Sequence, residues 1–180
     1  MTDNPYATVE TERLILRPLT PADLDAYQAA VYGDAEVMRY LPGGQPRPIE
    51  RTAGLIAFFD EHWKAHGFSA WAVVEKASGE LIGHAGLRYI GDTGAVELMY
   101  ALAKSAWGKG YATEAARAAL QFGFETVKLD EIHALAFAEN TASQQVMRKL
   151  GMGYQGATDR FHNARLEWYL MTREMHTGMA

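Results

Sequence analysis

The central part of the chain alternates apolar segments with glycine-containing turns, which restricts it to a meander of strands. Residues 70–75, 81–89 and 95–102 are rich in apolar, β-branched and aromatic side chains, and short turns separate them. Such spacing predicts three antiparallel strands. The alanine-rich segment that follows, residues 113–126, has the composition of a helix. A meander that leads into helices predicts a domain of mixed α+β structure.

The flanking segments extend this prediction in both directions. Residues 49–66 carry apolar side chains on or near one helix face and stop before Gly67, so they predict a helix. Upstream, residues 14–17 predict a strand, and Thr20 followed by Pro21 predicts a helix start. Downstream, we expect a strand, a helix and two more strands, at residues 132–137, 141–150, 152–155 and 166–171.

Length, charge and cysteine content limit the function classes. The 180 residues suit one domain, which we place at 11–175 behind a flexible N-terminal segment, 1–10. The absence of cysteine excludes disulfides and a catalytic thiolate. A net charge of −5 disfavours direct nucleic-acid binding through bulk charge. No signal-peptide pattern and no apolar run of about 20 residues is present, so we expect a cytoplasmic protein without a membrane partner.

Two other features leave alternatives open. The prolines and glycines of residues 42–48 predict a loop, either a mobile lip beside a site or a plain connector. His62 and His66 lie one helical turn apart, but Trp63 stands where a zinc-protease motif has glutamate, so we predict no metal site. His162 fits a structural or solvent-exposed role, although its predicted turn would let it reach an acceptor.

The segment Ala106–Glu114 is the strongest local candidate for a binding site. Gly108 and Gly110 permit a tight turn and close approach of a ligand. The helix that follows offers free N–H groups and a partial positive charge, and Lys109 adds a cation. These features favour a cradle for phosphate or pyrophosphate, whereas a tight turn without ligand is the alternative. Thr113 stands where the dinucleotide fingerprint needs glycine, and no P-loop sequence is present.

A second candidate lies between a predicted strand and the helix at 141–150. Asn140 is placed to cap that helix or to bind a ligand at the strand end. Ser143 and Met147 are four residues apart and therefore share one helix face. The spacing leaves open whether Ser143 faces a ligand or solvent.

Together these segments resemble the GNAT superfamily of N-acetyltransferases, which use acetyl-coenzyme A (acetyl-CoA). They are most similar to its ribosomal-protein N-acetyltransferase-like branch, the RimJ/RimL type. The resemblance rests on three blocks in the same order, Thr11–Leu19 followed by Asp23, Ala95–Leu102 leading into Trp107–Ala115, and Asn140–Met152. It implies a single GNAT-like domain with a splayed, mostly antiparallel central sheet flanked by helices.

The resemblance also implies how acetyl-CoA binds. Pantetheine would lie between the diverging strands 95–102 and 132–137, and the pyrophosphate would lie on the backbone N–H groups of the glycine turn. Ser105 stands where the superfamily often has Gln or Arg, but binding through backbone groups loses little by this change. The cofactor-binding residues so implied are Leu102, Ala103, Gly108, Lys109, Gly110, Tyr111, Ala112, Thr113 and Asn140.

Catalytic roles follow from the same resemblance. Many members carry, seven residues after the asparagine equivalent to Asn140, a tyrosine that protonates the leaving thiolate. Met147 occupies that position and has no proton to donate, so the acid role passes to Ser143. Glu97 matches the general base, for which we expect a pKa raised by a partly dry cleft. A plain surface glutamate is the alternative for Glu97.

The expected reaction is direct transfer of acetyl from acetyl-CoA to a primary amine, on a protein N-terminus or a small molecule, without a metal. A backbone N–H near Leu102 would stabilise the oxyanion. By fold analogy alone, Tyr40, Phe58, Trp63 and Arg160 are candidates for an acceptor pocket. The alternatives are a non-catalytic acyl-CoA-binding or regulatory module of the same fold, and a nucleotide-dependent enzyme. A homodimer is compatible with the resemblance. The acceptor's identity stays open, as does whether Glu97 acts directly or through water.

Overall fold

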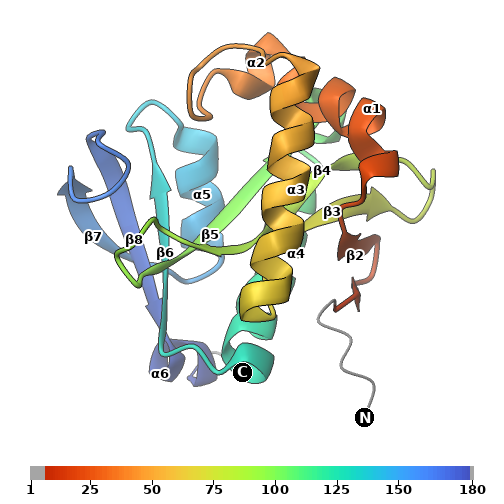
Figure 1. The fold of residues 1–180 in the computed structure, drawn as a ribbon. Helices are drawn as coiled ribbons and strands as arrows, with labels where there is room; N and C mark the ends of the chain where they lie inside the picture. Colours follow the sequence, from red (N-terminus) through yellow and green to blue (C-terminus); the bar gives the residue numbers. More distant parts are fainter. Residues whose placement is uncertain (1–6, 179–180) are drawn as a thin grey trace.

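One eight-stranded sheet runs through the computed structural model, which describes residues 7–178 (Figure 1). The strands lie in the order β1-β2-β3-β4-β5-β6-β8-β7, and every neighbouring pair is antiparallel except β5 with β6. The strands are β1 Val9–Glu10, β2 Leu14–Pro18, β3 Ala70–Glu75, β4 Leu81–Tyr89, β5 Val96–Leu102, β6 Glu131–Ala136, β7 Gly153–Thr158 and β8 Leu166–Thr172.

Helices cover both faces of this sheet and enclose two apolar cores. The α-helices are α1 Leu24–Tyr27, α2 Ala35–Met38, α3 Ile49–His66, α4 Tyr111–Gln121, α5 Thr141–Lys149 and α6 Arg173–Thr177. Short 3₁₀ or π turns lie at η1 Pro21–Asp23, η2 Gln28–Tyr32, η3 Lys104–Ala106 and η4 Phe122–Val127. Successive strand residues point to opposite faces, so Ala101 packs with α1–α3 and Leu102 packs with α4 and α5.

The parallel strands β5 and β6 meet at only one register position. Glu97 pairs with His133, whereas β4 and β5 pair from Gly83–Leu102 to Tyr89–Val96. Because β5 and β6 run in the same direction and pair near their starts, their carboxyl ends lie apart. The predicted splayed, mostly antiparallel sheet is therefore confirmed, and the gap lies on the carboxyl side of Glu97.

Most predicted elements are confirmed, two differ, and one helix is additional. The sequence predicts a flexible segment at 1–10, but Val9 and Glu10 pair with β2, and the Trp71 indole donates to the Ala7 carbonyl at 2.7 Å. Residues 1–6 lie outside the described residues. The alanine-rich helix begins at Tyr111 rather than at Thr113, and α6 is an addition to the predicted elements. Among residues 7–178, no helix is long and apolar enough to cross a bilayer.

Candidate active site

A cavity of about 350 Å³ lies between the carboxyl end of β5 and helix α5, which follows β6 in the chain. The end of β5, the turn before α4, the outer face of α5 and the segment from α2 to Leu41 form its walls. The predicted site residues that line it are Leu102, Gly108, Gly110, Tyr111, Ala112, Thr113, Asn140 and Ser143. Glu97, Ala103 and Lys109 are absent from this lining. The structure thus gathers two sequence-distant candidates, the glycine turn and the start of α5, around one cavity.

The glycine turn presents unpaired backbone donors to this cavity. Gly108 and Gly110 have φ values of 72° and 82°, in the left-handed region that favours glycine. Within residues 7–178, no hydrogen bond uses the backbone N–H groups of Gly108 through Thr113. The first N–H groups of an α-helix have no partner within the helix and carry a partial positive charge. This wall is therefore suited to an anion.

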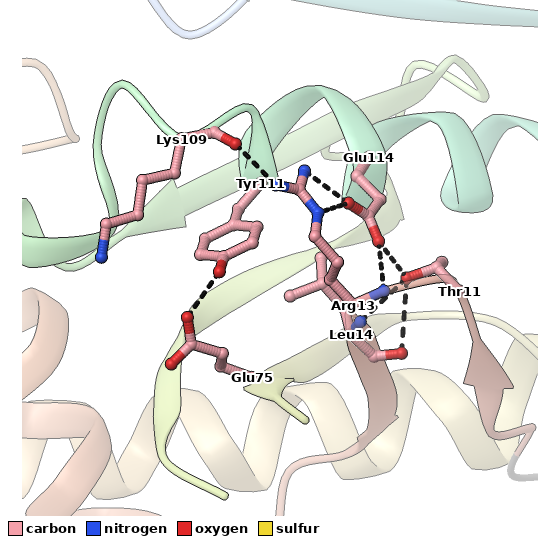
Figure 2. Close-up of polar contacts among 7 residues, drawn as sticks. All are labelled: Thr11, Arg13, Leu14, Glu75, Lys109, Tyr111 and Glu114. Atoms are coloured by element: carbon pink, nitrogen blue, oxygen red, sulfur yellow. Dashed lines mark hydrogen bonds and ion pairs between the residues drawn. The ribbon is translucent and has the colours of Figure 1, made fainter. Parts of the chain in front are cut away.

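A side-chain network fixes the same turn from outside (Figure 2). Glu114, in the first turn of α4, accepts hydrogen bonds from the Thr11 hydroxyl at 2.6 Å, the Arg13 N–H at 2.8 Å and Arg13 Nε at 2.7 Å. Arg13 Nη1 also donates to the Lys109 carbonyl at 2.9 Å. Burial alone would raise the pKa of Glu114, but these hydrogen bonds and the arginine charge lower it. The network ties the turn to the start of β2.

Tyr111 extends this network to the next strand. The Arg13 guanidinium lies 4.5 Å from the centre of the Tyr111 ring, and the Tyr111 hydroxyl donates to Glu75 Oε1 at 2.5 Å. Lys109 carries its ammonium away from these residues in Figure 2. The prediction that the Lys109 ammonium contributes to an anion site therefore stays a prediction.

A hydroxyl pair forms the opposite wall of the cavity. Asn140 Oδ1 caps α5 by accepting from the Ser143 N–H at 3.1 Å, as the sequence predicts. The Ser143 hydroxyl lies 2.9 Å from the Tyr100 hydroxyl, which also donates to the Ser143 carbonyl at 3.2 Å. Burial raises the pKa of Tyr100 to about 12, so its phenol keeps its proton at neutral pH. Ser143 is thus a partly buried cavity residue with a fixed neighbour.

Sequence reasoning missed Tyr100, although one signal for it existed. Tyr100 follows Glu97 by three positions on a strand, so the two side chains leave the sheet on opposite faces. A residue on that opposite face points toward the helix that carries Ser143. The contact itself joins positions 43 residues apart, which no local pattern encodes.

Glu97 is buried in an ion-pair cluster rather than open to the cavity. Its side chain is 7% exposed, with Oε1 2.6 Å from Arg88 Nε and Oε2 2.8 Å from His162 Nε2. Burial alone would raise the pKa of Glu97, but the hydrogen bond from His162 and the charge of Arg88 outweigh it, so the pKa is lowered. The predicted raised pKa is therefore wrong, because the sequence did not reveal the contacts of Glu97 with Arg88 and His162.

Two predicted cofactor-binding groups at the end of β5 already have hydrogen-bond partners within the protein. The Ala103 N–H donates to the Ile82 carbonyl at 2.7 Å, so this group is not free for a ligand. The Leu102 carbonyl accepts the Trp107 indole N–H at 2.8 Å, and a carbonyl retains a second lone pair. The Leu102 carbonyl can therefore still accept a hydrogen bond from a ligand, whereas the Ala103 N–H cannot donate one.

The candidate acceptor aromatics do not form one pocket. Tyr40 lines the cavity, whereas Trp63 is 1% exposed and donates to the Ala70 carbonyl at 3.0 Å. The expectation that Trp63 lines a pocket is wrong, because the indole completes the core. Phe58 is exposed, and the Arg160 guanidinium lies over the Phe161 ring.

His62 is committed to the backbone around it. Its Nδ1 lies 2.7 Å from the Phe68 carbonyl, and its Nε2 accepts the Tyr89 N–H at 3.2 Å. Within the described range 7–178, no group of three or more His, Asp or Glu side chains gathers as metal ligands. His62 and His66 therefore act as packed rings, 4.5 Å apart between centroids.

Comparison with known proteins identifies the family. The model for the acetyltransferase (GNAT) domain matches residues 13–153. The chain belongs to the GNAT acetyltransferase family. YkkB of Bacillus subtilis is 31% identical over 84% of this chain and 88% of YkkB. Spermidine N(1)-acetyltransferase of Escherichia coli is 31% identical over 78% of this chain and 73% of that enzyme.

Solved structures agree with this assignment. A GNAT-family acetyltransferase from Bacillus anthracis has a TM-score of 0.78 and 27% identity, covering 93% of this chain and 99% of that one. RimL, a ribosomal L7/L12 α-N-protein acetyltransferase solved with coenzyme A, has a TM-score of 0.78. Its identity is 16%, over 92% of this chain and 98% of RimL, so it shows a shared fold. Family membership makes this chain an acetyl-CoA-dependent acyltransferase.

Proposed function

We propose that this enzyme transfers the acetyl group of acetyl-CoA directly to a primary amine, with acetyl-CoA in the cavity between the end of β5 and α5. The observation that carries the proposal is the pairing of two opposed walls in one cavity. One wall holds six backbone N–H groups without partners among the described residues, and the other holds the Ser143–Tyr100 hydroxyl pair.

The chemistry of these walls suits the two ends of acetyl-CoA. Unpaired N–H groups at a helix start suit a pyrophosphate, and Gly108 has no side chain that would block its approach. Pantetheine then follows β5 through the gap, using the free lone pair of the Leu102 carbonyl in place of the occupied Ala103 N–H. With the pyrophosphate at the glycine turn and pantetheine along β5, the thioester lies toward Ser143.

The reaction needs a proton acceptor on one side and a proton donor on the other. An ammonium group has no lone pair, so the amine must lose a proton before its nitrogen attacks the acetyl carbonyl carbon. Glu97 lies where the two strands part and belongs to the accepting side. When the carbon–sulfur bond breaks, the Ser143 hydroxyl donates to the thiolate, while Tyr100 stays protonated and holds Ser143 in place.

The acceptor we propose is a primary amine on a polyamine or on a protein N-terminus. Two relatives support this range through their names, spermidine N(1)-acetyltransferase and the ribosomal α-N-protein acetyltransferase RimL. The RimJ/RimL-type branch, a homodimer and a cytoplasmic setting remain predictions from the sequence.

A thiol-release screen tests the proposal. Acetyl-CoA is incubated with the enzyme and with spermidine, N-terminal peptides, free amino acids or an aminoglycoside. We expect amine-dependent release of coenzyme A and an acetylated product by mass spectrometry for at least one class. Tight binding of acetyl-CoA by calorimetry without amine-dependent release across the panel would instead favour the non-catalytic module.

A further inference from the structure

His162 forms a pair with Glu97 across 65 positions of sequence. Its Nε2 lies 2.8 Å from Glu97 Oε2, and it comes from the loop between β7 and β8. The imidazole is 31% exposed, whereas the Glu97 side chain is 7% exposed. A substrate that approaches this cluster from solvent therefore meets His162 before Glu97.

The contact with Glu97 sets which ring nitrogen of His162 carries the proton. A carboxylate only accepts hydrogen bonds, and Glu97 is ionised at neutral pH, so Nε2 must be the N–H. In the neutral imidazole the lone pair then lies on Nδ1. Within residues 7–178, no hydrogen bond uses Nδ1 of His162. This nitrogen is free to accept a proton.

The backbone of this loop is held in a conformation that side chains disfavour. His162 and Asn163 have φ values of 57° and 50°, both in the left-handed region. The preceding Phe161 is 1% exposed and packs against the rings of His133 and Trp168. Such strain persists where the surroundings determine it and is concentrated at functional sites. The loop is therefore built to present His162 to Glu97.

We propose that His162 is the catalytic base of the reaction, and that Glu97, fixed by Arg88, orients it. This inference rests on the proposed function. Both oxygens of Glu97 are already engaged, with Arg88 and His162, whereas Nδ1 of the partly exposed His162 has a free lone pair. The role of base therefore passes from Glu97 to His162. The arrangement follows the logic by which a buried carboxylate holds a catalytic histidine in the correct tautomer.

The proton balance of the step is complete. Nδ1 of His162 takes one proton from the ammonium group, and the freed nitrogen lone pair forms the carbon–nitrogen bond to the acetyl carbon. The carbon–sulfur electron pair leaves with the thiolate. The second proton, lost by the attacking nitrogen, reaches the sulfur through the Ser143 hydroxyl, and imidazolium returns its proton to solvent.

The charged neighbours of His162 determine the expected pH dependence. Glu97 faces it directly, and Arg88 acts behind Glu97. From the packed strands, His133 contacts the neighbouring Phe161 and lies within hydrogen-bond distance of Glu131. The remaining charged side chains of the loop are Asp159, Arg160 and Arg165. Glu97→Gln removes the carboxylate that orients the imidazole, so kcat is expected to fall while the kcat/KM profile keeps its acidic limb.

The test compares His162→Gln with the wild type on the fastest amine from the thiol-release screen. Glutamine keeps an amide N–H for Glu97 but has no basic nitrogen. We expect kcat to fall about 100-fold or more, the acidic limb to disappear, and acetyl-CoA affinity by calorimetry to stay unchanged. Imidazole in the buffer is expected to restore part of the turnover of His162→Ala. The matched control is His66→Gln, an exposed histidine at the end of α3.

The outcomes separate this inference from the function on which it rests. If the wild type releases thiol with an amine while His162→Gln keeps its kcat and acidic limb, His162 is not the base and the proposed function stands. If His162→Ala loses activity and imidazole restores none, the role of the loop is structural and the inference is overturned. A wild type that turns over no amine overturns the proposed function, and this inference with it.

Discussion

The wall formed by the glycine turn, residues 108–113, and the Glu97 cluster are built from different chemical groups. The wall consists of backbone N–H groups on contiguous residues, with side chains such as Arg13 and Glu114 bracing it from outside. The cluster consists of side chains that three separate elements bring together, Arg88 from β4, Glu97 from β5 and His162 from the last loop. If the proposed function holds, acetyl-CoA binding depends on backbone shape, whereas proton transfer depends on side-chain identity.

This difference predicts opposite sensitivities to substitution. A change that alters φ or adds a charge in the wall is expected to weaken acetyl-CoA binding and leave the proton chemistry intact. A change of one functional group at Ser143 or in the Glu97 cluster is expected to reduce turnover and leave binding intact.

Among these substitutions, Gly110→Asp is expected to weaken acetyl-CoA binding most. A φ of 82° costs an aspartate about 1–2 kcal/mol, and its carboxylate repels a bound anion a few ångströms away by about 1 kcal/mol. We expect acetyl-CoA affinity by calorimetry to fall about 100-fold. Gly79→Asp is the control, because Gly79 has a φ of 72° in the turn between β3 and β4. An equal loss of acetyl-CoA affinity in both variants would show that backbone strain, and not the position in the glycine turn, causes the effect.

Ser143→Ala tests the opposite wall. Loss of the hydroxyl removes the donor to the leaving thiolate, and we expect kcat to fall about 100-fold with little change in acetyl-CoA affinity. Steady-state kinetics with calorimetry measure both quantities. An unchanged kcat would return Ser143 to the role of a plain helix residue.

Glu114→Gln separates the glycine turn from the side-chain network of Thr11, Arg13 and Glu114 that supports it (the brace). The amide keeps the shape but loses the charge that pairs with Arg13. Because the brace only positions the turn, we expect a few-fold weaker acetyl-CoA binding and an unchanged kcat. Glu80→Gln, an exposed position in the turn before β4, is the matched control. A fall in kcat without a change in affinity would contradict this separation.

Tyr100→Phe is expected to have a smaller effect on turnover than Ser143→Ala. It removes both contacts of the phenol with Ser143, at the carbonyl and at the hydroxyl, and leaves the serine hydroxyl in place. A loss of about 1 kcal/mol corresponds to a roughly fivefold lower kcat. A loss as large as that of Ser143→Ala would mean that the phenol itself supplies the proton.

The smallest effect concerns stability against pH. Burial alone would raise the pKa of Asp23, but hydrogen bonds from Arg17 and Thr20 outweigh it and lower the pKa. A lowered folded-state pKa contributes stability above the unfolded value of about 4, and this is lost as pH falls through the folded value. The free energy of unfolding, from urea titrations, should fall below about pH 4. Asp23→Asn should reduce this slope by at most ~1.4 kcal/mol per pH unit. An unchanged slope would contradict the account.

The two sides also differ in how far the sequence predicts them. The meander, the glycine turn and the Asn140 cap depend on residues that are neighbours in the chain, and these were predicted. The contacts of Glu97 with His162 and of Tyr100 with Ser143 join residues 65 and 43 positions apart. No local pattern encodes such contacts, so the pKa of Glu97 was predicted in the wrong direction.

A crystal structure with bound coenzyme A tests the central claim most directly. The account predicts diphosphate oxygens at about 2.7–3.2 Å from backbone nitrogens between Gly108 and Thr113, and the sulfur beside the Ser143 hydroxyl. Coenzyme A bound elsewhere, with the space between β5 and β6 vacant, would contradict it.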